Sequence, residues 1–162
     1  MKVLNLTDTE ESIKNPYFDH LARVDNLYLS TKVENKNQIK FLKDLNIEFA
    51  IDLKQKEETN FDDKNSFEKA GIDYFNLPVS DISKVSFNSL YLISELLENK
   101  NKNVLLYCYS ANRAAAILAL QLYLVHGHSK KRTIDLASKI GLKGNLKKKV
   151  LTILDKKKID PK

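Results

Sequence analysis

Apolar positions in this sequence form short runs separated by helical spacings, and this alternation predicts strands that alternate with helices. Residues 26–30 (NLYLS) alternate apolar and polar side chains, as a short strand does. Residues 48–53 (EFAIDL) and 104–109 (VLLYCY) are short and almost entirely apolar, which is typical of strands that are buried on both faces. Residues 72–79 (IDYFNLPV) predict a further strand, which ends near Pro78.

The segments between these strands have the three-to-four-residue apolar spacing of helices. Ile39, Leu42 and Leu45, for example, form one stripe, and Gly71 ends a shorter helix. The predicted helices are 34–45, 64–70, 87–100, 114–125, 130–140 and 146–154. Strands joined by helices of this length predict an α/β fold with a mainly parallel sheet of four to five strands flanked by helices, followed by an all-helical C-terminal segment.

The length and composition bound the class of protein. The 162 residues are enough for one domain with its own core, so we expect a single domain over 1–162, with a partly ordered segment at 1–25. Hydrophobic content of 43% and charged content of 30% are typical of a soluble globular protein. One cysteine excludes an internal disulfide and favours a reducing, cytoplasmic setting, and no signal peptide or membrane-spanning stretch is recognisable.

The net charge of +6 is unevenly distributed. Residues 129–162 hold twelve Lys or Arg against three Asp, a net +9, so the rest of the chain carries −3. Basic helices at 129–158 raise the alternative of nucleic-acid binding. These lysines are spaced as the polar faces of amphipathic helices and lack interleaved aromatic residues, so we do not expect nucleic acid as a partner.

The strongest chemical signal is the stretch 103–125 (NVLLYCYSANRAAAILALQLYLV), in which a strand ends at Cys108 and a helix begins near Arg113. Backbone N–H groups at a helix start attract an oxyanion, and an arginine there adds two parallel donors. The same field lowers the pKa of a thiol, which makes it a nucleophile. The residues expected to bind phosphate are Tyr109, Ser110, Ala111, Asn112 and Arg113.

A lone cysteine at the end of an apolar strand is also compatible with an inert core residue. The joint occurrence of strand end, cysteine, small-residue loop, arginine and helix start favours the catalytic interpretation. In parallel sheets, ligands bind beyond the carboxyl ends of the strands, which is where Cys108 is predicted to lie.

Four segments resemble the bacterial cysteine-phosphatase-like family, a branch of the dual-specificity and tyrosine phosphatases associated with β-lactamase hydrolase-like proteins. The matching segments are LYLST at 27–31, FAIDLK at 49–54, GIDYFNLPVS at 71–80 and LLYCYSANRAA at 105–115. The resemblance implies hydrolysis of a phosphate monoester through a phosphocysteine on Cys108, with Arg113 holding the phosphate oxygens. It also implies a phosphorylated protein or a small phosphate ester as the partner, and no cofactor.

Two further site residues follow from the resemblance. Asp81, on the loop after the third predicted strand, is the candidate general acid, although a solvated carboxylate that caps the next turn would look the same. Lys54 lies where the family tends to have arginine and is a possible substrate contact, although a surface lysine is the simpler description. The histidines His20, His126 and His128 do not have the spacing of a ligand set, so we expect no metal.

The loop departs from the commonest phosphatase pattern at four points. Only four residues separate Cys108 from Arg113, as in many rhodaneses, where most tyrosine phosphatases have five. Tyr107 replaces the usual histidine, and Ala111 replaces a glycine, which would strain the backbone if φ there is positive. Ala114 replaces a serine or threonine, which predicts a higher thiol pKa and slower hydrolysis of a covalent intermediate.

These departures keep two other functions open. One is a rhodanese-like sulfurtransferase that carries a persulfide on Cys108, although the Asp-x-Arg and Gly-His-Ile stretches usual in rhodaneses are absent. The other is a catalytically weak phosphate-binding pseudophosphatase, which Tyr107, Ala111 and Ala114 favour.

Overall fold

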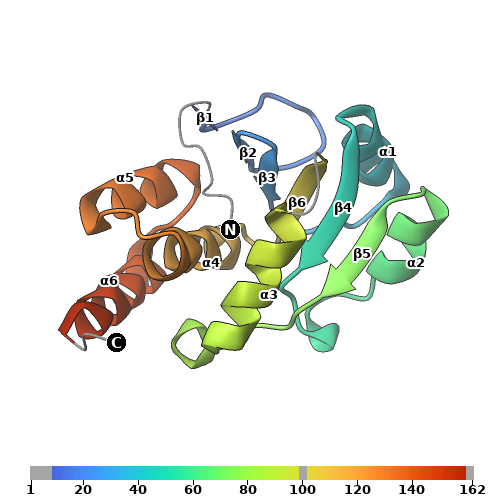
Figure 1. Cartoon of the computed structure of the whole chain (residues 1–162). Helices are drawn as coiled ribbons and strands as arrows, with labels where there is room; N and C mark the ends of the chain where they lie inside the picture. Colours follow the sequence, from blue (N-terminus) through green and yellow to red (C-terminus); the bar gives the residue numbers. More distant parts are fainter. Residues whose placement is uncertain (1–8, 99–101, 160–162) are drawn as a thin grey trace.

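The structure is a computed structural model that describes residues 9–98 and 102–159. Its centre is a sheet with the strand order β1-β2-β3-β6-β4-β5 (Figure 1). The strands are β1 (Thr9–Glu10), β2 (Leu21–Val24), β3 (Leu27–Ser30), β4 (Ile47–Asp52), β5 (Asp73–Asn76) and β6 (Asn103–Tyr107). The helices are α1 (Lys36–Asp44), α2 (Asp63–Lys69), α3 (Phe87–Glu98), α4 (Asn112–Leu120), α5 (Lys130–Ile140) and α6 (Gly144–Ile159).

Four adjacent strands of the sheet, β3, β6, β4 and β5, run parallel, and β2 and β1 add an antiparallel edge. This arrangement, with helices around the sheet and an all-helical C-terminal part, confirms the predicted fold class. The two edge strands were not predicted. β2 and β3 form a hairpin whose turn places Asp25 at a φ of 54°, and β1 contributes only two residues.

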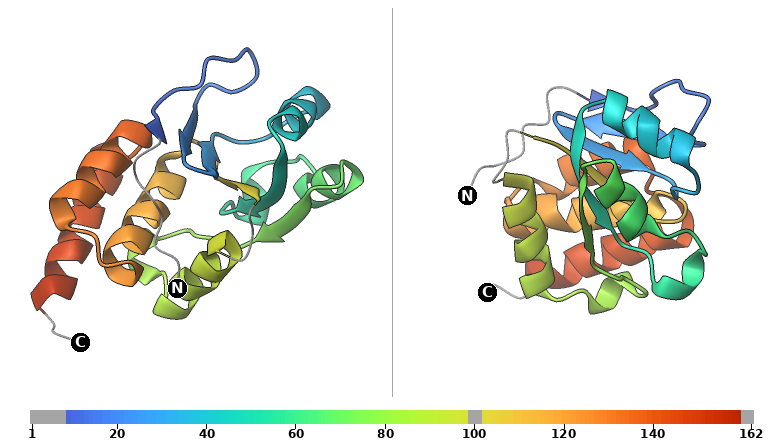
Figure 2. Two further views of the ribbon diagram at one scale, coloured as in Figure 1. Left: turned by 45° about the horizontal axis from the view of Figure 1, so that its top comes forward. Right: turned by 90° about the vertical axis from the view of Figure 1, so that its right-hand side faces the viewer.

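The helices divide between the two faces of the sheet (Figures 1 and 2). α1 and α2 cover one face, where Leu42 and Phe67 pack against Leu105 of β6. α3 and α4 lie on the other face, and α5 and α6 pack against α4 as an outer layer, so that apolar residues of these helices share one core cluster with Val104 and Leu106 of the same strand. β6 is therefore buried on both sides, as its apolar run predicted.

The long apolar segment after Arg113 changes its helical geometry part-way. α4 ends at Leu120, and residues Gln121–Val125 form a π-helical turn, η3. α5 then begins after Ser129, whose side chain caps the helix by accepting a hydrogen bond from the N–H of Arg132. Within the described ranges, no helix combines the length and the apolar character needed to cross a membrane.

Candidate active site

The candidate site lies at the edge of the sheet where β3, β6, β4 and β5 all end. The loop after β6 carries Cys108, which is fully buried against α4, while Tyr109 and Ser110 are exposed. Ala111, at the start of α4, has a φ of 71° and lies in the left-handed region. The strain predicted for an alanine at this position is therefore present, at a cost of about 1–2 kcal/mol relative to an ordinary backbone conformation.

The backbone of this loop presents N–H groups without protein acceptors. Among the hydrogen bonds of the described residues, none has the N–H of Tyr109, Ser110 or Ala111 as its donor. The first i→i−4 bond of α4 runs from Ala115 N to Ala111 O at 3.0 Å, so the preceding N–H groups of α4 also lack a partner of this kind. These donors lie at the positive end of the α4 dipole, an arrangement that suits an oxyanion.

Neighbouring segments hold the loop on two sides. The carbonyl of Tyr109 accepts a hydrogen bond from Lys32 N at 3.1 Å. The side chain of Asn112 makes two hydrogen bonds with the α5–α6 connection. Its Oδ1 accepts from Lys143 N at 3.1 Å, and its Nδ2 donates to Lys143 O at 3.3 Å. These contacts thus fix the loop without using the N–H groups of Tyr109, Ser110 and Ala111.

Arg113 is held by Glu58, a residue that the sequence analysis did not identify. Arg113 Nη1 donates to Glu58 Oε2 at 2.8 Å, and Nη2 donates to Glu58 Oε1. Nη1 also donates to the carbonyl of Val79 at 2.8 Å. The hydrogen bond from Arg113 lowers the pKa of Glu58, and the bond to Glu58 raises the pKa of Arg113.

The geometry of a guanidinium group decides what remains available on Arg113. The planar group has five N–H donors, and the pair with Glu58 uses its Nη1–Nη2 end. The Nε hydrogen and the second Nη2 hydrogen form the adjacent edge, which matches two oxygens of a phosphate. Glu58 therefore orients Arg113 and leaves it a bidentate edge for an anion.

Glu58 itself is fixed by a short helical turn, η1 (Lys56–Glu58), that follows β4. Its Oε2 also accepts from Gln55 N at 2.7 Å, which closes a capping box at the start of the turn. The sequence signal was present as glutamine followed three residues later by glutamate.

Asp81 lies on the loop after β5, as predicted, and caps the 3₁₀ turn η2 (Ile82–Lys84). Its Oδ1 accepts from Ser83 Oγ at 2.7 Å, from Ser83 N at 3.0 Å and from Lys149 Nζ at 3.1 Å. The Ser83 side chain foremost, followed by the Ser83 amide and by Lys149, lowers the pKa of Asp81 to about 2. In this arrangement the carboxylate is ionised at neutral pH, so its role as a proton donor stays a prediction.

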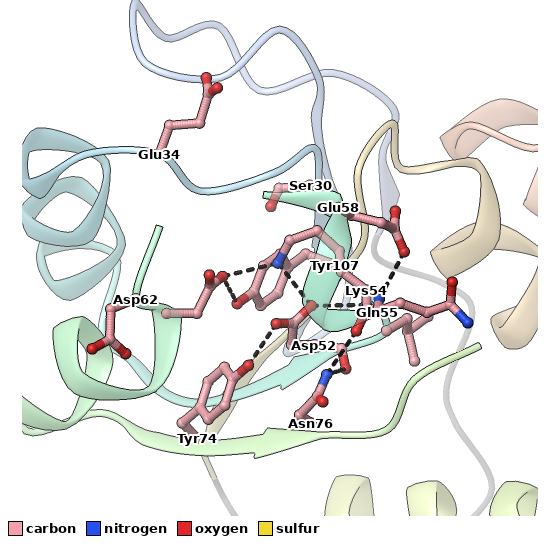
Figure 3. A network of polar contacts seen from close by, with 12 residues as sticks. Ser30, Glu34, Asp52, Lys54, Gln55, Glu58, Asp62, Tyr74, Asn76 and Tyr107 are labelled. Carbon is pink, nitrogen blue, oxygen red and sulfur yellow. Dashed lines mark hydrogen bonds and ion pairs between the residues drawn. The ribbon is translucent and has the colours of Figure 1, made fainter. Parts of the chain in front are cut away.

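Lys54 lies in the interior, not on the surface (Figure 3). Its side chain is 2% exposed, and its Nζ lies 2.9 Å from both Asp52 Oδ1 and Asp63 Oδ2. Two hydroxyl groups complete the cluster: Tyr74 donates to Asp52 Oδ2 at 2.6 Å, and Tyr107 donates to Asp63 Oδ2 at 2.5 Å. The alternative of a surface lysine is wrong, and an ammonium already held by two carboxylates is poorly placed to contact a substrate.

Burial dominates the protonation of this polar cluster. It raises the pKa of Asp63, against the opposing hydrogen bonds of Tyr107 and Lys54. It also raises the pKa of Tyr107 well above its usual value, and the nearby charges of Asp52 and Asp63 act in the same direction. Both tyrosines of the cluster are therefore neutral donors at physiological pH.

Tyr107 links this cluster to the loop, because it is the residue before Cys108. Its carbonyl accepts from Leu53 N at 2.9 Å, and its ring lies 4.6 Å from Lys54 Nζ. Tyr107 thus occupies the position that is commonly histidine in the family that this sequence resembles. It is buried, and its hydroxyl group is held by Asp63.

No protein-family model and no curated protein sequence matches this chain. Several solved structures, in contrast, are similar to this chain. The active form of Tk-PTP has 17% sequence identity and a TM-score of 0.65, over 80% of this chain and 91% of that one. PTPMT1 has 23% identity and a TM-score of 0.62, over 85% and 94% of the two chains. P. aeruginosa TpbA, crystallised in complex with pTyr, has 17% identity and a TM-score of 0.61, over 80% and 84%.

The chain has the cysteine-phosphatase fold. The resemblance predicted from the sequence is confirmed at the level of the fold. The structure places Cys108 in the loop after β6 and Arg113 in the first turn of α4, and it brings the Arg113 guanidinium to Val79, two residues before Asp81. Lys54 is separate from this group, in the buried cluster beneath the end of β6.

Proposed function

We propose that this protein is a cysteine-dependent phosphatase that hydrolyses a phosphate monoester through a phosphocysteine on Cys108. The observation that carries the proposal is the oriented Arg113. Glu58 binds one end of the guanidinium and leaves an edge for two phosphate oxygens, beside a loop whose N–H groups have no acceptor in the described part of the chain.

In the first step, the Cys108 thiolate attacks phosphorus and the bond to the ester oxygen breaks, so that the leaving group departs with its electron pair. The loop N–H groups and Arg113 stabilise the charge on the equatorial oxygens. In the second step, water attacks the phosphocysteine, which releases inorganic phosphate and regenerates the thiolate.

Asp81 is the proposed donor of the proton that the leaving oxygen needs. Because its contacts with Ser83 and Lys149 hold the pKa near 2, little of it is protonated at neutral pH. This arrangement favours aryl esters, since a phenolate, with a conjugate pKa of about 10, leaves without full protonation. Phosphotyrosine or a related aryl phosphate is therefore the proposed substrate class, within a phosphorylated protein or a small ester.

The low pKa of Asp81 also favours a second candidate, a phosphate-binding protein with weak turnover. An ionised Asp81 slows the first step, and Ala114 has no hydroxyl group to assist departure of the thiolate in the second. Binding of phosphate is expected in both cases, and the rate of turnover separates them.

Hydrolysis of p-nitrophenyl phosphate tests the proposal. We expect turnover by the wild type, a loss of at least about 10³-fold in Cys108→Ser, and a large loss in Arg113→Ala. Lys131→Ala, at an exposed position on α5, is the matched control and should leave the rate unchanged. Phosphate binding with equal, near-zero rates for wild type and Cys108→Ser would support the binding protein, and transfer of sulfur from thiosulfate to cyanide without phosphatase activity would support the sulfurtransferase.

A further inference from the structure

A cavity of about 650 Å³ lies beside the Cys108 loop and is not used by the chemistry described so far. Tyr109 and Ser110, the two residues after the nucleophile, form one side of it. Its other walls come from three segments: residues 17–20, residues 31–38 after β3, and residues 138–143 at the α5–α6 connection. The cavity therefore lies at the carboxyl edge of β3 and β6, where ligands of parallel sheets bind.

Hydrogen bonds join these walls to one another and to the loop. His20 O accepts from Thr31 N at 3.2 Å, and His20 Nε2 lies 2.6 Å from Ile140 O. The bond from Lys32 N to Tyr109 O joins the second wall to the loop, and the two Asn112 contacts with Lys143 join the third. The shape of the cavity is thus set by the same contacts that fix the loop.

Cations and aromatic rings give the cavity its chemical character. Tyr17 and Tyr109 line the cavity and are 42% and 44% exposed, although Phe41 packs against the Tyr17 ring and Lys32 Nζ lies 4.1 Å from the centroid of the Tyr109 ring. The ammonium of Lys32 is already engaged, 3.0 Å from Glu34 and 2.9 Å from the Tyr109 hydroxyl group.

Two further lysines on the cavity wall, Lys139 and Lys143, have ammonium groups with no hydrogen bond or ion pair to another described residue. One carboxylate that lines the cavity, Asp19, is likewise without such a partner. Lys139 lies in the last turn of α5 and Lys143 just after that helix, and the charge of Lys139 also reaches Asp135, which is paired with Lys131. Among the described residues that line the cavity, two cations without an ion pair or hydrogen bond thus stand against one such anion.

We propose that this cavity binds the leaving-group part of the substrate, and that this part carries a second anionic group which Lys139 and Lys143 bind. The inference rests on the proposed function, because it places the first phosphate in the loop. A tyrosine ring of the substrate would lie against Tyr109, and the second anion would be a carboxylate or a phosphate. Two sources provide this chemistry: acidic residues beside a phosphotyrosine in a peptide, and a small bisphosphate ester.

Binding to the Cys108→Ser variant tests the proposal without depending on turnover. The ligands are a phosphotyrosyl peptide flanked by Asp and Glu, the same peptide with Gln and Asn in their place, and a small aromatic bisphosphate beside its monophosphate. We expect the extra anions to tighten binding about tenfold at low salt, and this preference to fall as the salt concentration rises. Of the acidic peptide and the bisphosphate, the ligand that binds more tightly identifies the source.

The double change Lys139→Gln with Lys143→Gln should abolish the preference while leaving the hydrolysis of p-nitrophenyl phosphate unchanged. Lys147→Gln with Lys148→Gln removes the same charge from residues of α6 that do not line the cavity, and should retain the preference.

Equal affinities for the acidic and neutral ligands, or an equal loss in both double variants, would overturn the inference even if the protein is a phosphatase. The protein could instead prefer the acidic ligands through Lys139 and Lys143 and yet hydrolyse no phosphate ester. That result would support the binding site and refute the phosphatase.

Discussion

Tyr107 and Cys108 are adjacent at the end of β6 but belong to opposite faces of the sheet, and their surroundings differ in kind. On the Tyr107 side, Lys54 is matched by two carboxylates, and each carboxylate also accepts a tyrosine hydroxyl group. On the Cys108 side, the N–H groups of Tyr109, Ser110 and Ala111 have no acceptor among the residues that the structure describes.

The difference separates a structural role from a binding role. A buried polar cluster whose members satisfy one another stabilises one arrangement of the chain and has little to offer a ligand. Backbone donors without a protein acceptor are satisfied only by an anion or water. The region with the buried ion pairs is therefore the one that we do not expect to contact substrate.

Removing the buried cation should have the largest effect on stability. Lys54→Met leaves Asp52 and Asp63 buried without their common partner, so we expect a loss of about 3–5 kcal/mol of unfolding free energy, measured by urea denaturation. Lys64→Met removes an exposed lysine paired with Glu68 and should change stability by less than about 1 kcal/mol. Similar effects in the two variants would show that the cluster is not structural.

Neutralising the residue that orients Arg113 should reduce activity more than stability. Glu58→Gln keeps the shape of the side chain but weakens its hold on the guanidinium, and we expect kcat/KM for an aryl phosphate to fall about 10–100-fold, equivalent to about 1.4–2.7 kcal/mol. The neighbouring Glu57→Gln is the control and should behave as wild type. An unchanged kcat/KM in Glu58→Gln would contradict the positioning role.

The contacts of Asp81 predict an unusual dependence of activity on pH. An acid with a pKa of about 2 loses its proton below the neutral range, so kcat/KM for an alkyl phosphate should already be falling as pH rises from 4 to 7. Ser83→Ala removes the largest cause of the lowered pKa, so the falling limb should move to higher pH and the rate at pH 6 should rise several-fold.

Asp81→Asn is the control for this profile and should remove the limb altogether. If wild type, Ser83→Ala and Asp81→Asn share one pH profile, Asp81 is not the general acid.

The smallest expected effect concerns the strained alanine of the loop. Ala111→Gly relieves the left-handed backbone, and because glycine also costs entropy on folding, we expect a net gain of only about 0.5–1 kcal/mol. Ala115→Gly, within α4, should have the opposite sign, since glycine destabilises a helix interior by about 1 kcal/mol. Thermal unfolding of both variants measures the contrast, and a destabilised Ala111→Gly would show that no strain is stored there.

The parts of the fold with a clear apolar period could be predicted from the sequence. The buried strand before Cys108, the helix after Arg113 and the cap at Ser129 all follow from local rules. The glycine usual at the position of Ala111 raised strain only on the condition of a positive φ, and the structure meets that condition. The hairpin of β2 and β3 was missed because its first strand is four residues long and its turn at Asp25 contains no glycine.

The partners of the site residues could not be predicted, because they depend on contacts between distant segments. Glu58 meets Arg113 across 55 positions of the sequence, and Tyr107 meets Asp63 across 44. Lys54 was misplaced for the same reason: a lysine two positions after the end of a strand is normally exposed, and only the fold supplies the two carboxylates that bury it.

The most direct test of the central claim is to look for the covalent intermediate. Wild-type protein is mixed with an aryl phosphate, quenched in acid and analysed by mass spectrometry of the peptide that contains Cys108. We predict one phosphoryl group on Cys108, accumulating because Ala114 cannot assist its hydrolysis, and none in Cys108→Ser. An unmodified Cys108 in protein that turns over the ester, or a persulfide on Cys108 after thiosulfate with no phosphoryl group from any ester, would contradict the account.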